Sequence, residues 1–186
     1  MILPMELPQI LQSIGDFYPN QLQQIQDLCS TDSLKKQSFL LKEGQICSFI
    51  TFLTSGTAYQ SKNIDGEEVV LELYTPGDII LNHSSFMHQK PSTEEIKAFS
   101  DCKVSILSIE NLHQLISYSQ VFLQLAKVFE SSPVQKAIFE RNLTPYEKYQ
   151  QLLDLKPNWI QSFPLKMIAS YLKITPETLS RVRAMG

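Results

Sequence analysis

The chain has 186 residues, of which 43% are hydrophobic and 19% charged, a composition typical of a folded protein with one large or two small domains. This composition excludes a disordered or fibrous protein, and the sequence has no apolar run near the roughly 18 residues that cross a bilayer. The N-terminus has neither the basic nor the continuous apolar region of a signal peptide, so we expect a cytoplasmic protein with no membrane partner.

Charge is distributed unevenly along the chain, although the formal net charge is only −3. Residues 1–140 hold nine basic against sixteen acidic side chains, whereas residues 141–186 hold seven basic against three acidic ones. An acidic body followed by a basic segment indicates that a polyanion would bind the C-terminal part only. A positive face that is simply exposed to solvent explains the same asymmetry, so charge alone leaves both interpretations open.

The N-terminal segment is predicted to form two short amphipathic helices between Leu7 and Leu28. Apolar residues recur there at spacings of three and four, which place them on one face of a helix. The pattern is interrupted from Gly15 to Pro19, where we expect the break between the two helices.

From Ser38 to Ile109 the sequence is typical of an antiparallel sandwich or jelly roll. Short β-branched or aromatic runs alternate with turn signals, and Asp65-Gly66 between two such runs is a strong hairpin signal. The predicted strands cover Ser38–Lys42, Ser48–Thr54, Thr57–Asn63, Glu68–Tyr74, Ile79–Leu81, Glu94–Phe99 and Lys103–Ile109.

The pattern becomes helical again after Ile109. A short helix is predicted over Asn111–Ser117 and a longer one from about Ser119 to Leu143, with a kink or break at Pro133 because proline removes a backbone donor. A further helix is expected from about Pro145 to Leu155, ended by Lys156-Pro157-Asn158. The longer helix has more apolar residues than one face needs, so we expect it to pack against a second copy of the chain as well. The apolar residues in question are Val121, Leu125, Val128 and Phe129.

The last thirty residues predict a helix-turn-helix. The first helix follows Pro164 and carries an apolar face at spacings of three, four and seven, and the second is capped by Thr175 and begins at Pro176. The buried residues are expected to be Leu165, Ile168, Ala169, Leu172, Leu179 and Val182. A plain helical hairpin with a polar surface is the alternative.

The open face of the second helix carries side chains that can read the major groove of DNA. Arg181 can donate two hydrogen bonds to guanine, Glu177 can accept one from the cytosine amino group, and the methyl group of Thr178 can contact thymine. Three basic residues are expected to bind phosphates without reading sequence, namely Lys166, Lys173 and Arg183.

Several of these motifs, in this order, resemble the Crp/Fnr transcription regulators, the family of the cyclic-AMP receptor protein. The β-roll glycine pattern of that family is similar to Lys42-Glu43-Gly44-Gln45, Phe52-Leu53-Thr54-Ser55-Gly56, Asp65-Gly66-Glu67-Glu68 and Pro76-Gly77-Asp78. Its helix-turn-helix is similar to residues 165–172 and 174–181. One glycine turn is weak evidence, but four turns, a long helix and the terminal motif together are strong.

The resemblance implies an α+β fold with an N-terminal antiparallel β jelly roll, a long dimerisation helix and a C-terminal winged-helix-type helix-turn-helix. The corresponding parts are a cyclic-nucleotide-binding-like sensor domain (1–117), the dimerisation helix (118–143) and a DNA-binding domain (144–186). It also implies a homodimeric DNA-binding regulator that reads a pseudo-palindromic operator. The partners are then double-stranded DNA, a second copy of the chain and an unidentified small-molecule effector.

The sequence departs from the phosphate-binding cassette of the effector-binding members. That cassette is Gly-Glu, followed about ten residues later by Arg-Ser/Thr-Ala, whose guanidinium pairs with the cyclic phosphate. The aligned effector-pocket residues are Leu81, Asn82, Ser92, Thr93 and Glu94. Ser92 would replace the arginine beside Glu94, which should cost several kcal/mol of phosphate binding. We therefore expect the effector not to be cyclic AMP.

The helix-turn-helix departs from the family at two positions. Lys173 stands in the turn where the family favours glycine, and a left-handed backbone there would cost about 1–2 kcal/mol. Pro176 occupies the family's first base-reading arginine position, which leaves Glu177, Thr178 and Arg181 as readers and predicts a different operator.

The sequence lacks the motifs of an enzyme, and we expect no catalytic residues, no metal and no cofactor. His83 and His88 are not spaced like the ligands of a cupin metal site, and Cys29, Cys47 and Cys102 are too dispersed for a metal site or a disulfide framework. No nucleophile elbow, phosphate loop or dinucleotide fingerprint occurs. The alternative function is a ligand- or partner-sensing jelly-roll module with weak or lost DNA binding.

Overall fold

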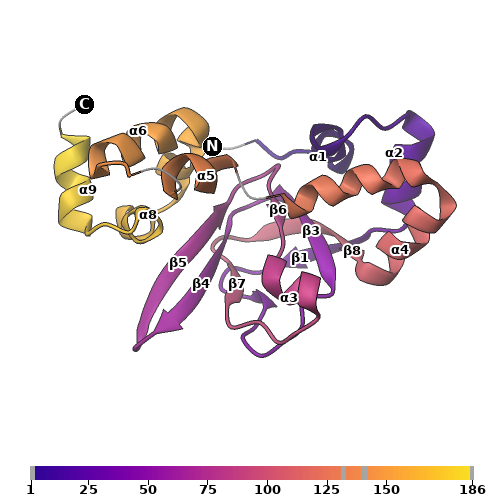
Figure 1. The fold of residues 1–186 in the computed structure, drawn as a ribbon, viewed down its shortest axis with the longest axis horizontal. Helices are drawn as coiled ribbons and strands as arrows, with labels where there is room; N and C mark the ends of the chain where they lie inside the picture. The colour runs from indigo at the N-terminus through magenta and orange to yellow at the C-terminus, as the bar shows by residue number, and fades with distance from the viewer. Residues whose placement is uncertain (1–2, 131–132, 140–141, 185–186) are drawn as a thin grey trace. The chain divides into compact units, whose positions relative to one another are not determined.

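The computed structural model describes residues 3–130, 133–139 and 142–184, which form two compact units (Figure 1). The β-roll unit contains Met1–Gln60 and Tyr74–Glu130, and the helical unit contains Ser61–Leu73 and Ser131–Gly186. We refer to Ser61–Leu73 as the hairpin arm. No helix in these ranges is both long and apolar enough to cross a membrane.

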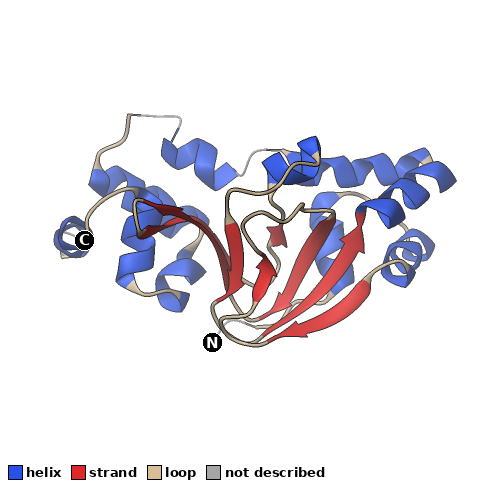
Figure 2. Ribbon diagram, turned by 90° about the horizontal axis from the view of Figure 1, so that it is seen from below, coloured by secondary structure: helices blue, strands red, loops and turns tan. Residues whose placement is uncertain are grey.

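Two antiparallel sheets form the roll, as the sequence predicts (Figure 2). Their strand orders are β1-β8-β3-β6 and β2-β7-β4-β5. The strands are β1 (Ser30–Leu34), β2 (Phe39–Leu41), β3 (Phe49–Ser55), β4 (Ala58–Ile64), β5 (Glu67–Tyr74), β6 (Ile79–Ile80), β7 (Glu95–Ala98) and β8 (Cys102–Ser108). Residues from both sheets join α1 (Leu7–Ile14) and α2 (Pro19–Asp27) in one hydrophobic core. The predicted pair of N-terminal helices is thus confirmed, with its break at residues 15–18.

Glycine turns connect the strands at the predicted positions. Asp65 and Gly66 have φ values of 53° and 86°, the left-handed pair that a two-residue hairpin turn requires. Gly56 has φ +87°, and a Cβ atom there would lie 2.2 Å from the carbonyl oxygen of Asp101, so only glycine fits.

Two elements of the roll were not predicted from the sequence. Strand β1 is polar and mostly exposed, because it is an edge strand that pairs antiparallel with β8, with Ser30 opposite Ile106. Helix α3 (His83–His88) is a short helix capped by Asn82, whose side chain accepts a hydrogen bond from Ser85 N–H. Neither element has the apolar periodicity by which sequence analysis finds strands and helices.

The long helix predicted from Ser119 to Leu143 is not continuous. After α4 (Ile109–Tyr118) the chain forms a 3₁₀ helix, η1 (Gln120–Phe129), and a separate helix, α5, begins at Pro133. The expected break at Pro133 is confirmed, because proline favours the first turn of a new helix. The remainder of the prediction, at residues 131–132 and 140–141, lies outside the described residues.

Of the four apolar residues expected on a dimer surface, Leu125 is instead fully buried in the core of its own roll. A 3₁₀ helix has three residues per turn, so Phe122, Leu125 and Val128 lie on one side. Phe122 and Leu125 are each 1% exposed in the core of their own roll. The other apolar residues, Val121, Val128 and Phe129, pack against this core. The exposed apolar side chain of η1 is instead Leu123, at 52%.

The helical unit is built around two buried aromatic side chains. Trp159 and Tyr171 are each 1% exposed, and their rings meet edge to face with centroids 5.0 Å apart. Its helices are α5 (Pro133–Phe139), α6 (Pro145–Leu155), α7 (Pro157–Ser162), α8 (Leu165–Leu172) and α9 (Pro176–Arg183). Helix α6 matches its prediction, whereas α7 was not predicted because it starts within the expected helix breaker. Between Pro145 and Ala184 the described residues form helices and turns, and the strands of a wing are not among them.

Candidate nucleic-acid interface and effector site

Helices α8 and α9 and the turn between them lie where the sequence predicts a helix-turn-helix. Lys173 has φ 57° and ψ 46°, the left-handed conformation expected at this position. The turn satisfies the last carbonyls of α8, since Lys173 N–H donates to Ser170 O at 3.1 Å and Ile174 N–H donates to Ala169 O at 3.0 Å. The Lys173 ammonium also lies 4.7 Å from the ring centroid of Phe139, a favourable contact that offsets part of the backbone strain.

Helix α9 begins as predicted, and its cap orients its first turn. Thr175 Oγ1 accepts a hydrogen bond from Thr178 N–H at 3.2 Å, and Pro176 occupies the first helical position. Leu179 and Val182 are buried, which turns the opposite side of the helix to solvent. The structure therefore places the predicted readers Glu177 and Arg181 on the exposed face and leaves Thr178 half-buried.

Glu177 is held in its charged form at the start of α9. Hydrogen bonds from its own backbone N–H and from the side chain of Thr175, and to a smaller extent the charge of Arg181, lower the pKa of its carboxyl group below the usual range. An ionised carboxylate only accepts hydrogen bonds, which is the role that contact with a cytosine amino group requires.

Basic side chains of the unit come from the helix-turn-helix and from α6. Lys166, Lys173 and Arg183, the predicted phosphate contacts, are all exposed. Sequence analysis missed Lys148 of α6, whose Nζ lies 3.4 Å from the Leu172 carbonyl oxygen and 5.5 Å from the Phe139 ring centroid. No sequence signal marks it, because only the packing of α6 brings Lys148 to the C-terminal end of α8.

Only some of the predicted effector-pocket residues lie close together. Asn82 is 2% exposed, and its Nδ2 donates to Glu94 Oε2 at 2.7 Å. The Ser92 hydroxyl is turned to the backbone of Glu94, at 2.9 Å from its carbonyl oxygen and 3.0 Å from its nitrogen. Leu81 instead packs against the apolar core, and Thr93 is exposed, so these two do not belong to the cluster.

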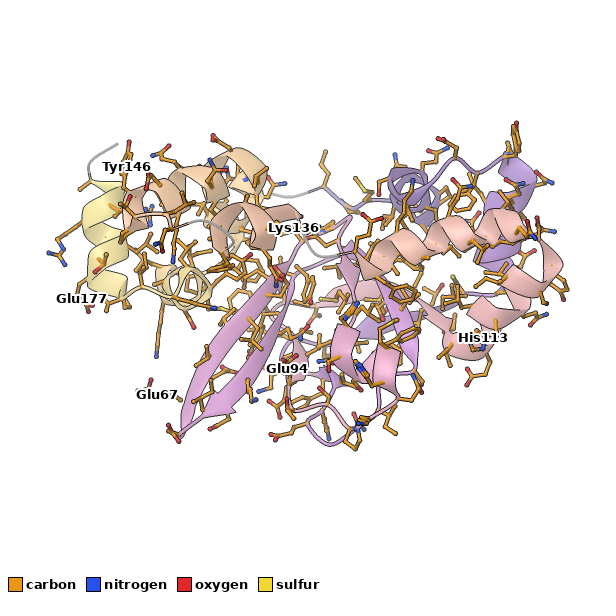
Figure 3. The ribbon with its side chains drawn as sticks, viewed as in Figure 1. Glu67, Glu94, His113, Lys136, Tyr146 and Glu177 are labelled. Atoms are coloured by element: carbon orange, nitrogen blue, oxygen red, sulfur yellow. The ribbon has the colours of Figure 1, made fainter. Side chains whose placement is uncertain are left out.

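Two further residues, which sequence analysis did not single out, complete this cluster. Gln60 of β4 donates a second hydrogen bond to Glu94 Oε2, and the Tyr74 hydroxyl donates to Gln60 Oε1 at 2.9 Å. The side-chain amides of Asn82 and Gln60 thus both donate hydrogen bonds to the carboxylate of Glu94, a residue that is labelled in Figure 3. An anionic ligand at this place would meet a negative charge instead of free donors.

The histidine and cysteine side chains considered for metal or redox chemistry are hydrogen-bonded or at least partly buried within the fold. Nε2 of His83 lies 3.1 Å from Phe129 O, and among the described residues no group of three potential ligands is placed to hold a metal ion. All three cysteines are free, and burial raises the pKa of Cys29 to about 12 and that of Cys102 to about 11. Thiols with raised pKa values are poor nucleophiles.

Comparison with known proteins identifies the roll and the overall fold. Residues 31–119 match the family model of the cyclic nucleotide-binding domain, whereas no curated protein sequence matches the chain. Among solved structures, FixK2 from Bradyrhizobium japonicum has a TM-score of 0.65 at 16% identity, over 84% of this chain and 83% of that one. The catabolite activator protein of Thermus thermophilus has a TM-score of 0.55 at 16% identity, over 92% of this chain and 84% of that one. A putative cAMP-binding regulatory protein from Silicibacter pomeroyi has a TM-score of 0.60 at 15% identity, over 96% and 85% of the two chains.

At 15–16% identity these structures establish the fold. They confirm the α+β architecture of antiparallel sheets and helices that the sequence predicts. Residues 31–119 are thus similar to the cyclic nucleotide-binding domain, and the chain shares its fold with FixK2 and with the catabolite activator protein.

Proposed function

We propose that the protein is a sequence-specific DNA-binding transcription regulator whose recognition helix is α9. The observation that carries the proposal is the packing of α9, which buries Leu179 and Val182 and leaves Glu177 and Arg181 exposed. A helix held in this way can enter the major groove with its polar face toward the bases. Glu177, Thr178 and Arg181 then read bases, while Lys166, Lys173 and Arg183 contact phosphates.

The regulator acts as a homodimer on a pseudo-palindromic operator. A two-fold dimer presents its recognition helices about 34 Å apart, which is one turn of duplex, and so reads an inverted repeat. In this proposal residues 1–117 form the sensor domain, residues 118–143 form the dimerisation segment, which we call the dimer segment, and residues 144–186 form the DNA-binding domain. The large apolar side chains that are exposed in the described part of the dimer segment are Leu123 and Tyr118, at 52% and 64%.

The operator is the direct test of this function. Selection of bound fragments from a random duplex library should enrich a motif with two inverted half-sites whose centres lie about one helical turn apart. Enrichment of no motif would contradict sequence-specific binding and favour the alternative function, a sensing module with weak or lost DNA affinity. Enrichment of a single half-site would contradict the homodimer but would still agree with α9 as the recognition helix.

We expect no cyclic nucleotide to act as the effector. Calorimetric titration with cyclic AMP and with cyclic GMP at millimolar concentration should show no micromolar binding, because Ser92 stands at the position of the arginine and the carboxylate of Glu94 lies beside it. The site should bind either no ligand or an uncharged or cationic small molecule. Micromolar binding of either nucleotide would contradict this assignment of the pocket.

A further inference from the structure

The hairpin arm makes polar contacts with helices that lie far from it in sequence. The N–H group of Val70, a residue that is 5% exposed, donates to Ser170 Oγ on α8 at 2.9 Å. Gln135 Nε2 on α5 donates to Glu72 Oε2 of the arm at 2.7 Å. The arm and these helices belong to one compact unit, so the contacts are part of its packing.

Glu72 also lies close to the buried core of the helical unit. The hydroxyl of Tyr171 has no hydrogen-bond partner among the described residues, although its side chain is 1% exposed. Burial first, and then the negative charge of Glu72, raise the pKa of this hydroxyl. The arm is therefore docked against α8, the first of the two C-terminal helices, through the hydrogen bond to Ser170.

The charge of the arm is opposite to that of a DNA-binding surface. It holds four carboxylates against one basic residue, Lys62. The carboxylates are Asp65, Glu67, Glu68 and Glu72. In Figure 3, Glu67 lies at the tip of the arm.

We propose that the hairpin arm is an acidic brake on DNA binding that is held against α8 by the hydrogen bond between Val70 and Ser170. In a helix-turn-helix the first helix crosses the phosphate backbone, so negative charge docked on it opposes the approach of DNA. Both ends of the arm are joined covalently to the β-roll unit, so a conformational change in the roll can change how the arm docks on α8. This inference rests on the proposed function and adds to it the means of regulation.

Three single variants of the full chain test the brake. Ser170→Ala removes the acceptor of the Val70 amide and should release the arm, and Glu67→Gln should lower its charge without releasing it. Glu43→Gln neutralises an exposed carboxylate of the β-roll unit and is the matched control. Hydrogen exchange of residues 61–73 reports docking, and fluorescence anisotropy with a random-sequence duplex at low salt reports DNA affinity.

We expect Ser170→Ala to accelerate exchange across the arm and to raise affinity at least about threefold. Glu67→Gln should raise affinity with unchanged exchange, and Glu43→Gln should leave both unchanged. Unchanged exchange in Ser170→Ala would overturn the docking role of the hydrogen bond. If the unaltered protein binds DNA, and Ser170→Ala shows faster hydrogen exchange in the arm but no higher DNA affinity, the brake would be overturned and the proposed function would stand. If no variant bound any duplex, including a variant with a released arm, the proposed function would be overturned together with the brake.

Discussion

Replacing Arg181 with alanine should weaken binding to the selected operator by about 1–3 kcal/mol, or about 5- to 150-fold, and relax the preference at one base position. The guanidinium of Arg181 is on the exposed face of α9 and can donate two parallel hydrogen bonds to guanine. The loss should be largest on the operator and small on a random duplex, because only the operator offers the matching base.

Lys166→Ala is the matched control for this prediction. Lys166 is an exposed residue of α8, and loss of a phosphate contact should weaken binding to all sequences alike while lowering the salt slope by about one. Binding of both variants should be measured by titration of labelled duplexes at several salt concentrations. If Arg181→Ala bound the operator as tightly as the unaltered protein, α9 would not be the reading helix.

Replacing Leu125 with aspartate should destabilise the β-roll unit by more than about 4 kcal/mol. Leu125 is 1% exposed, so the substitution leaves a cavity and also places a carboxylate in the core. Denaturant unfolding followed by circular dichroism measures the loss. From sequence alone Leu125 belongs to a dimer surface, and a stable monomeric Leu125→Asp variant would favour that view over the structure.

The informative substitution for dimerisation is instead Leu123→Asp. This side chain is 52% exposed, so the variant should keep the stability of the fold and shift the protein from a dimer toward a monomer. Light scattering after size exclusion should give about twice the 21.3 kDa chain mass for the unaltered protein and a lower mass for the variant. An unchanged dimer would place the interface elsewhere.

The sequence by itself determined the elements that carry strong local signals. The apolar spacing of Leu7–Leu28, the glycine turns of the roll and the Thr175-Pro176 start of α9 all depend on interactions within a few residues. The left-handed backbone of Lys173 was instead suggested by the family resemblance, since the family favours glycine at this turn. Such features can be predicted because capping, turn geometry and helical periodicity act over one or two turns of chain.

Tertiary structure alone decided where the remaining residues act. The polar strand β1 exists because β8 supplies its hydrogen-bond partners, and Leu125 is buried because η1 adopts a period of three against its own roll. The donors around Glu94 come from strand β4 and from the cap of α3, and the hydrogen bond between Val70 and Ser170 joins residues 100 positions apart. These arrangements arise from long-range packing, in which a side chain's environment is set by distant residues that no local pattern records.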